Sequence, residues 1–561
     1  MDAVKTFASK LLTNKLLLFS SLWVVVMIVY MPAYKAGFIA DFIGMYFYID
    51  DVSFLDFLNR SNAEVKSFYQ VTQLQLYALI HLFGTSPIPW FLLFTSLHAL
   101  NGALAFSFFK NLLQDFGVRN ARLIALFGML FFLFNPNITE VTIWKGGYHY
   151  LTGILMQIGI LIWTRKYLLT GNGKFVVYAI GVFFLSLFTL EIFYITPALT
   201  LALILGYSWA GLIDSSTFRS ALKKIFLVQA VLFFLHLLLF RISHGAWIAH
   251  YGVTNEFSLA TGDLLPKVGK YLSNLIFLTG HWPEKTRFAF YEFLSKPAVY
   301  YSVSLILILA LSILLVRFKK LSAEMQIAAF LLLGIICSLI LVSPIYFDDL
   351  FSAYNSRRSY QPGLFTYMLV ALLIFKVGNK NFSMWFSAFY LLVCLIYTER
   401  KVFHWKTAAT IQYGILKDFP FRKNDPVLLL NLPSYYKDVR IMPANELNEF
   451  EQQMKLFESD TMSGKLYEVS SYNMQHTWDG AHVTVLDSMT LKVTLNQWGT
   501  WWMYNYGGAG SYENELYKVN MTDPGHEYIL SLKSKPANMA ILFQQGSSWK
   551  KVDMNETGEQ W

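Results

Sequence analysis

Four aspartates follow the first apolar span of the chain: Asp41, Asp50, Asp51 and Asp56. A carboxylate beside a bilayer is costly, so such residues usually serve a function. Partial desolvation raises the pKa of a carboxylate and lets it act as a general base. We expect this role first for Asp41, which lies closest to the span, and next for Asp50 and Asp51. The alternative is that the acids only solvate a surface helix, which is our interpretation of Asp56 and of one member of the Asp50–Asp51 pair.

A second group of candidates lies in the short stretch between two later spans. Lys145 and His149 stand at the mouth of a span, and Gly146 and Gly147 between them would let backbone approach a ligand. Basic side chains beside exposed backbone amides are suited to binding a phosphate or diphosphate. A snorkelling lysine and an interfacial histidine are the alternative.

Two adjacent arginines, Arg357 and Arg358, precede the next-to-last apolar span. They run against the charge pattern of the other loops and therefore need anionic partners. We expect one arginine to bind a phosphate and the other to form an internal ion pair, for which Asp348 and Asp349 lie near in sequence. Glu191 lies in a very short turn between apolar spans, where we expect it to be buried against protein and to orient a basic residue.

The rest of the chain must hold these groups in a membrane. Of its 561 residues, 55% are hydrophobic and only 14% are charged, and the mean hydropathy is +0.42, whereas roughly a quarter of the residues in a soluble domain are charged. A spanning helix needs about 20 apolar residues. We therefore expect eleven transmembrane helices, at 15–35, 88–109, 121–136, 148–164, 175–190, 193–210, 224–241, 297–316, 325–343, 361–377 and 382–398.

Lysines and arginines are concentrated in alternate loops, which predicts a cytoplasmic N-terminus. The outer segments are then 36–87, 137–147, 242–296 and 344–360, followed by an outer C-terminal region. The net charge of +9 is thus a topology signal and gives no reason to expect nucleic-acid binding. The sequence predicts a multi-pass protein of the inner (cytoplasmic) membrane.

Two domains are expected. Residues 1–403 form the transmembrane domain, and residues 404–561 form an extracytoplasmic soluble domain. The fold class is mainly α and polytopic, with an α+β C-terminal domain. Within the first outer loop, helical spacing predicts surface helices at 42–58 and 71–83. In the C-terminal domain, alternating runs predict strands at 427–432, 483–486, 491–495 and 528–532, and amphipathic spacing predicts a helix at 445–457.

The remaining polar residues give weaker indications of function. His98 lies within a span, where we expect an interhelical hydrogen bond. Cys337 and Cys394 lie in apolar runs and predict neither a disulfide nor a metal site. No cofactor is required by these patterns; a divalent cation held by Asp50 and Asp51 is the one alternative.

The chain resembles the GT-C class of membrane glycosyltransferases. The similarity rests on the many spans, the acidic first outer loop and the outer C-terminal domain. The local matches are Gly37-Phe38-Ile39-Ala40-Asp41-Phe42; Leu190-Glu191 followed by Pro197; Asn355-Ser356-Arg357-Arg358-Ser359-Tyr360-Gln361-Pro362; and Val427-Leu428-Leu429-Leu430-Asn431-Leu432-Pro433, the last similar to uncharacterised members of a Bacteroidetes-like group.

The resemblance implies a function. The class takes a sugar from a polyprenyl-phosphate donor and transfers it to an extracytoplasmic glycan, lipid or protein. Asp41 occupies the position of the catalytic acid, with Asp50 and Asp51 as alternatives because Asp41 lacks the neighbouring acid found in many members. The resemblance also implies that Lys145, His149, Glu191, Arg357, Arg358 and Tyr360 contribute to binding the substrate and the lipid phosphate.

Two other functions remain open at the level of sequence. One is a polymerase or ligase that uses lipid-diphosphate-linked oligosaccharides, for which outer arginines would do similar work. The other is a lipid or glycan transporter without chemistry. A transporter is expected to show internal repeats or broken helices near the membrane midplane, and the sequence shows neither.

Overall fold

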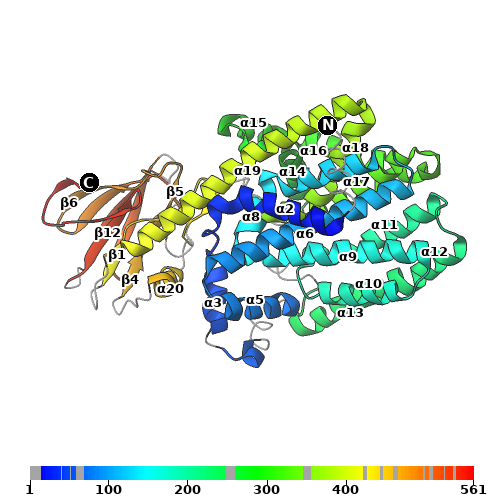
Figure 1. Cartoon of the computed structure of the whole chain (residues 1–561). Helices are drawn as coiled ribbons and strands as arrows, with labels where there is room; N and C mark the ends of the chain where they lie inside the picture. Colours follow the sequence, from blue (N-terminus) through cyan, green and yellow to red (C-terminus); the bar gives the residue numbers. More distant parts are fainter. Residues whose placement is uncertain are drawn as a thin grey trace. The chain divides into compact units, whose positions relative to one another are not determined.

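The computed structural model describes residues 14–39, 41–50, 52–57, 68–247, 260–344, 356–420, 426–442, 447–458, 465–496, 500–503, 510–523, 525–534 and 538–560. For residues 41, 48, 50, 261, 447–449 and 500–503 it describes the backbone alone. The chain forms two compact units (Figure 1). The first comprises Met1–Met31 and Val52–Val402, and the second comprises Pro32–Asp51 and Phe403–Trp561.

The first unit is built of helices. The long ones are α2 (Lys15–Tyr30), α6 (Pro87–Asp115), α7 (Ala121–Leu133), α9 (Tyr148–Thr170), α10 (Lys174–Ser186), α11 (Thr196–Trp209), α13 (Leu227–His244), α14 (Thr261–Phe277), α16 (Pro297–Val316), α17 (Ala323–Val342), α18 (Tyr360–Val377) and α19 (Lys380–Lys417), which continues into the second unit. Shorter ones are α5 (Gln70–Phe83), α8 (Thr139–Ile143), α12 (Ser215–Ala221) and α15 (Glu284–Leu294).

The helices confirm a polytopic membrane protein, but not the expected number of spans. Among the described residues, eight helices are long and apolar enough to cross a membrane, or nine if the bent pair 121–133 and 136–143 is one span. The expected spans 148–164 and 175–190 are helical but are not among these. The second of them, α10, has only 13 residues, fewer than the roughly 20 that a span needs.

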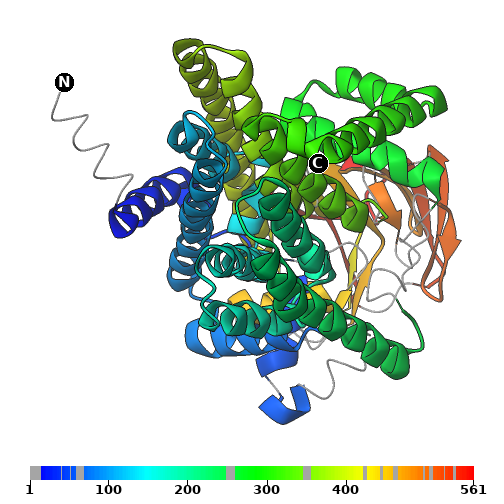
Figure 2. The ribbon, with the colours of Figure 1, turned by 90° about the vertical axis from the view of Figure 1, so that its right-hand side faces the viewer.

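The helices of the first unit lie side by side (Figure 2), and small residues let them pack closely. A Cβ added at Gly128 of α7 would lie 2.5 Å from Met368 Sδ of α18, and one added at Gly153 of α9 would lie 2.0 Å from the ring of Phe193. Side chains at these glycines would push the helices apart. Close backbone approach of this kind is how helices associate in lipid, where the hydrophobic effect contributes little.

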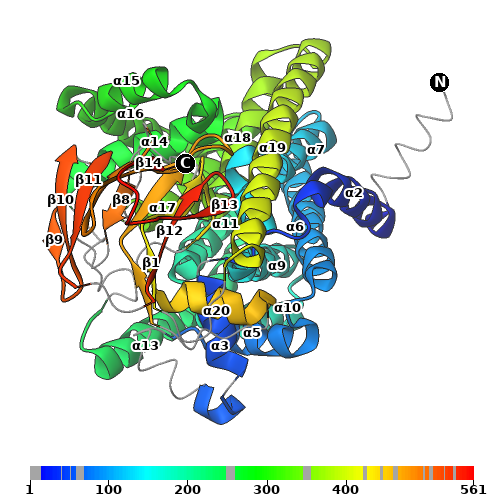
Figure 3. The same cartoon turned by 90° about the vertical axis from the view of Figure 1, so that its left-hand side faces the viewer.

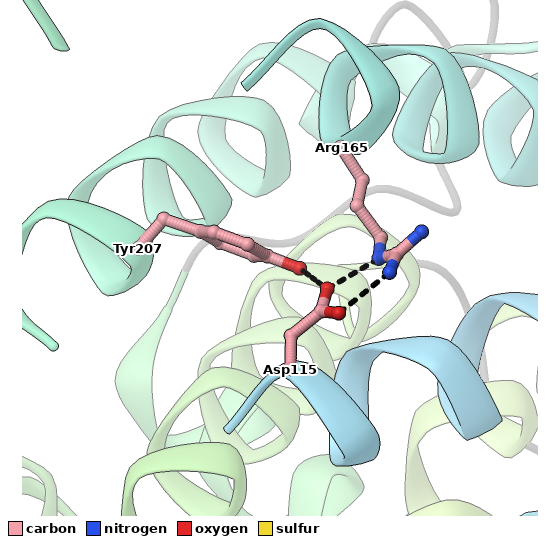
Figure 4. A network of polar contacts seen from close by, with 3 residues as sticks. All are labelled: Asp115, Arg165 and Tyr207. Carbon is pink, nitrogen blue, oxygen red and sulfur yellow. Dashed lines mark hydrogen bonds and ion pairs between the residues drawn. The ribbon is translucent and has the colours of Figure 1, made fainter. Parts of the chain in front are cut away.

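The carboxylate of Asp115 joins the ends of three helices (Figure 4). Arg165 of α9 donates to both of its oxygens, with Nε 2.5 Å from Oδ2 and Nη2 2.6 Å from Oδ1, and the Tyr207 hydroxyl of α11 donates to Oδ2. Bidentate pairs of this kind are strong and directional. They place the ends of α6, α9 and α11 on one side, which the charge pattern predicts to be cytoplasmic.

Replacing Asp115 with Asn is expected to lower the free energy of unfolding by about 3 kcal/mol, because Arg165 would keep its charge in a largely buried site. Thermal unfolding of the purified chain in detergent measures this. Glu324→Gln is the matched control, since it breaks a more exposed pair in which Lys376 Nζ lies 3.3 Å from the carboxylate, and such pairs contribute roughly 0–1 kcal/mol. Equal losses in the two variants would contradict the prediction.

His98 makes the interhelical hydrogen bonds expected of it. Its Nε2 lies 3.0 Å from the Leu133 carbonyl oxygen and its Nδ1 lies 2.9 Å from the Tyr360 hydroxyl. Asn101 donates to the same hydroxyl at 3.1 Å and to the Leu151 carbonyl at 2.9 Å. The fully buried network therefore connects α6 to α7, α9 and α18.

The second unit contains three sheets and helix α20 (Leu447–Glu458), which confirms the α+β prediction (Figure 3). Their strand orders are β13-β12-β1-β4, β3-β2-β5-β8 and the antiparallel β14-β6-β7-β11-β10-β9. The strands are β1 (Val427–Leu429), β2 (Leu432–Tyr436), β3 (Val439–Arg440), β4 (Leu466–Glu468), β5 (Ser470–Met474), β6 (His482–Asp487), β7 (Thr490–Thr494), β8 (Thr500–Met503), β9 (Tyr512–Glu513), β10 (Tyr517–Asp523), β11 (Glu527–Leu532), β12 (Ala540–Gln545), β13 (Ser548–Lys551) and β14 (Gly558–Gln560).

The start of the first outer loop belongs to the second unit. Helix α3 (Asp41–Asp50) packs against α20, as Figure 3 shows. Gln412 of α19 donates to the Phe38 carbonyl oxygen at 3.3 Å and to Gln453 Oε1 at 3.0 Å. The acidic loop is thus divided, with residues 32–51 in the second unit and the remainder in the first.

Candidate functional site

The candidate site lies in the first unit, where two of the expected outer loops meet. The short helices η2 (Pro136–Ile138) and α8 from one loop pack against η9 (Ser356–Ser359) from the other. The chain turns sharply at η2 because the Asn135 side chain accepts a hydrogen bond from the Asn137 amide at 2.9 Å. It turns again at Gly146, where an added Cβ would lie 2.3 Å from the Trp144 ring.

A buried ion pair holds the two loops together. Glu140 Oε1 lies 2.5 Å from Arg357 Nη1. The other oxygen of Glu140 accepts from the Arg357 amide at 3.0 Å and from Ser356 Oγ at 3.2 Å. Both side chains of the pair are largely buried, at 13% exposure for Arg357 and 8% for Glu140. Glu140 therefore fixes both the backbone and the side chain at the start of η9.

An aromatic ring positions the same arginine from a second side. The Arg357 guanidinium carbon lies 4.6 Å from the centroid of the Trp144 ring, a cation–π contact of the kind that arginine and tryptophan favour. We refer to Glu140, Trp144, Tyr271, Arg357 and Arg358 as the Glu140 cluster.

Helix α14 adds Tyr271 and further positive charge beside Arg358 of η9. Arg358 is buried and hydrogen-bonds the Tyr271 hydroxyl. Burial raises the pKa of Tyr271, and the two arginines oppose part of that rise. Lys267 and Lys270 lie one turn or less before Tyr271. Burial lowers the pKa of Lys267, Asp263 opposes this shift, and Arg358 and Lys270 add to it, so both cations lie close enough to Lys267 to repel it.

The predicted phosphate-binding residues of the other loop lie beside the cluster. His149 is near enough to Arg357 to interact with it electrostatically. Its Nδ1 is buried and, among the described residues, has no hydrogen-bond partner. Lys145 is buried, with Nζ 5.2 Å from the centroid of the Phe94 ring. Burial lowers the pKa of Lys145 to about 7. The structure thus brings His149 together with Arg357 and Arg358, whereas the Lys145 side chain contacts Phe94.

Tyr360, another residue predicted to bind the substrate or lipid phosphate, has a different environment. It is fully buried, and its hydroxyl is bonded to His98 and Asn101 within the helices. That geometry gives Tyr360 a part in helix packing. These hydrogen bonds do not test the predicted contact between Tyr360 and the substrate, which stays a prediction.

Glu191 lies against α5, the second surface helix expected in the first outer loop. Its Oε1 accepts from the Tyr69 hydroxyl at 2.5 Å. The same helix is held at Thr72, whose hydroxyl donates to the Thr189 carbonyl at 3.1 Å, and whose carbonyl accepts from the Tyr148 hydroxyl. Glu191 thus accepts a hydrogen bond from a tyrosine, and its role in orienting a basic residue stays a prediction.

The acidic candidates lie in or next to α3. Asp41 is the first residue of this helix and Asp50 the last, and their side chains, like Asp51, lie outside what the structure describes. Asp56 belongs to the first unit, is exposed, and accepts a hydrogen bond from Ser53 Oγ at 2.7 Å.

Asp348 and Asp349, the acids expected to pair with an arginine, also fall outside the described residues. Within the described residues, no group of three His, Cys, Asp or Glu side chains could hold a metal ion.

Sequence reasoning missed Glu140 and Tyr271. Glu140 is the one acid in the stretch 137–147. A charge in a short loop at the membrane edge requires a partner, and the two outer arginines were the available ones. That signal could have paired Glu140 with the arginines. Tyr271 offers no comparable signal, because an aromatic residue in an amphipathic helix is usually a packing residue.

Comparisons with known proteins give distant structural likenesses only. No family model and no curated protein matches the chain. Among solved structures, the apo oligosaccharyltransferase of Archaeoglobus fulgidus matches with a TM-score of 0.37 and 10% identity, over 80% of this chain and 64% of that one. The archaeal oligosaccharyltransferase AglB from the same organism, in complex with an inhibitory peptide and a dolichol-phosphate, matches with a TM-score of 0.35 and 9% identity, over the same shares of the two chains.

A third match is ArnT from Cupriavidus metallidurans bound to undecaprenyl phosphate, with a TM-score of 0.32 and 13% identity, over 80% of this chain and 85% of that one. The chain spans less than two thirds of the length of the two archaeal structures. With TM-scores below 0.5, these likenesses decide nothing about the chemistry of this chain.

Proposed function

We propose that the chain is a GT-C-like membrane glycosyltransferase. It moves a sugar from a polyprenyl-phosphate donor to an extracytoplasmic glycan, lipid or protein. The observation that carries this proposal is the clustering of His149, Arg357 and Arg358 beside Glu140, the carboxylate that pairs with Arg357 among the described residues. A second guanidinium beside this ion pair, in a largely dehydrated site, suits a lipid phosphate.

The proposed roles follow from the chemistry. The oxygen of an acceptor hydroxyl attacks the anomeric carbon, and the bond between that carbon and the phosphate oxygen breaks. Asp41 takes the hydroxyl proton, and the electron pair leaves with the polyprenyl phosphate. One base is enough for a direct, inverting displacement, whereas retention through a covalent intermediate needs two close carboxylates.

The arginines have separate roles in this proposal. Arg357 is already paired with Glu140, which takes up most of its charge, and therefore shapes the site. Arg358 is buried beside the neutral Tyr271 hydroxyl and lies close to Lys267. We propose that Arg358 and His149, whose Nδ1 is buried, contact the phosphate.

The deciding experiment incubates the purified chain with two donor lipids. These are a polyprenyl-phosphate monosaccharide and a polyprenyl-diphosphate oligosaccharide. We expect release of free polyprenyl phosphate from the first, coupled to glycosylation of an acceptor. Turnover of the second alone would favour the polymerase or ligase, and movement of intact lipid without release would favour the transporter.

The pKa of Lys145 leads to a pH prediction. With a pKa of about 7, Lys145 is charged below that pH and neutral above it, so its attraction for phosphate is lost as the pH rises. We expect kcat/KM for the donor to fall above pH 7, because this ratio reports groups of the free enzyme. Lys145→Met should remove that alkaline limb and lower kcat/KM at pH 6. An unchanged limb in this variant would assign it to another group.

A further inference from the structure

A cavity lies in the first unit, at the opposite end of α6 and α9 from the Glu140 cluster. Its volume is about 480 Å³, within the usual range of roughly 300–1,000 Å³ for ligand sites. It lies between α2, α6 and α9, and its walls are apolar side chains such as Leu18, Phe106 and Trp163. The Glu140 cluster follows α7, which returns antiparallel to α6, so the two sites belong to different ends of these helices.

Basic side chains line one part of this cavity: Lys15, Lys110, Arg165 and Lys166. Arg165 is neutralised by its bidentate pair with Asp115. The three lysines differ from it, because none of them forms an ion pair with another described residue. The aliphatic part of the cavity therefore ends in three positive charges that the described part of the chain leaves uncompensated.

Of the three lysines, Lys15 and Lys166 are exposed, and Lys110 is more enclosed. Lys110 is half-buried, and its Nζ lies 5.6 Å from the Phe106 ring centroid. Lys15 and Arg165 lie near enough to Lys110 to interact with it electrostatically. Bringing cations together against an apolar wall is unfavourable unless an anion joins them. A ligand with a negatively charged head group and an apolar tail would neutralise the lysines and fill the apolar part of the cavity.

We propose that this cavity binds one acidic phospholipid of the cytoplasmic leaflet, with its phosphate on Lys15, Lys110 and Lys166 and an acyl chain along the apolar wall. We choose an acidic phospholipid as the ligand because its negative head group complements the charge of the three lysines. The cavity lies at the helix ends that the lysine and arginine pattern predicts to be cytoplasmic, and basic pockets between spans on that side bind anionic head groups. This site is independent of the proposed glycosyl transfer.

The test is native mass spectrometry of the full chain titrated with phosphatidylglycerol, with phosphatidylcholine as the neutral comparison. Changing Lys15, Lys110 and Lys166 together to Gln should weaken phosphatidylglycerol binding roughly 100-fold, at about fivefold per lysine. The matched control changes Lys223, Lys224 and Lys320 to Gln, three exposed lysines of the same predicted side. This control should bind as the unaltered chain does.

A second variant tests the apolar half without touching charge. Ala103 lines the cavity, and Ala103→Phe should fill it and weaken binding roughly tenfold, the effect of losing about two buried methylene groups. Equal losses in the two lysine triples would show diffuse surface attraction and overturn the proposal. Equal binding of phosphatidylcholine, or tighter binding of a polyprenyl phosphate than of phosphatidylglycerol, would overturn it as well.

Discussion

Replacing Asp41 with Asn is expected to slow sugar transfer by a factor on the order of 10³, the usual contribution of a general base. Asn keeps the size of the side chain but cannot accept the proton of the acceptor hydroxyl. Asp41 is the first residue of α3, so the variant should also insert and fold normally. The measurement is the single-turnover rate with a polyprenyl-phosphate sugar, together with the amount of protein in the membrane.

Asp56→Asn is the matched control for this prediction. Asp56 lies on the same outer loop, is exposed, and is bonded only locally to Ser53, so its variant should retain full activity. Asp50→Asn and Asp51→Asn separate the alternatives that the sequence left open. Full activity in Asp41→Asn, with loss of activity in one of these two variants, would assign the role of general base to that other aspartate.

The second large effect is expected for Glu140→Gln. This change leaves Arg357 charged and largely buried without its counter-ion, which costs about 3–5 kcal/mol of stability. It also loosens η9, because Glu140 accepts from the Arg357 amide and from Ser356. We expect a marked fall in thermal stability and a large rise in the KM for the donor.

A double variant separates structure from function at this pair. Glu140→Gln with Arg357→Met removes both charges, and replacing a buried pair by apolar groups is often neutral for stability. The double variant should therefore recover most of the stability lost in Glu140→Gln. It should not recover the KM, because Arg357 also shapes the site through Trp144. Full recovery of both would reduce the pair to a structural role.

The secondary structure could be predicted well from local pattern. Alternation in 483–486, 491–495 and 528–532 gave the strands β6, β7 and β11, and the amphipathic stretch 445–457 gave α20. The membrane spans were predicted less accurately than the strands. The stretch 175–190 is apolar enough to suggest a span, but helix α10 ends at Ser186, because apolarity alone does not determine where a helix ends.

The types of residue in the candidate site could be predicted from the sequence, but the contacts between these residues could not. A charged residue at a membrane edge is visible in a sequence, and Lys145, Arg357 and Arg358 were identified as candidates in this way. The partner of Arg357 lies 217 residues away, and two nearer acids, Asp348 and Asp349, fitted the local reasoning equally well. Only the packing of α8 against η9 selects Glu140.

The positive charge beside the Glu140 cluster has a consequence for handling the protein. Arg358 and Lys270 oppose the charge of Lys267, whereas Asp263 favours it, and an anion that enters would relieve the repulsion between these cations. Because a ligand that binds only the folded state stabilises it by mass action, occupancy and melting temperature are coupled. Detergent extraction that strips anionic lipid should therefore leave a less stable protein, and restoring a lipid phosphate should return the lost stability.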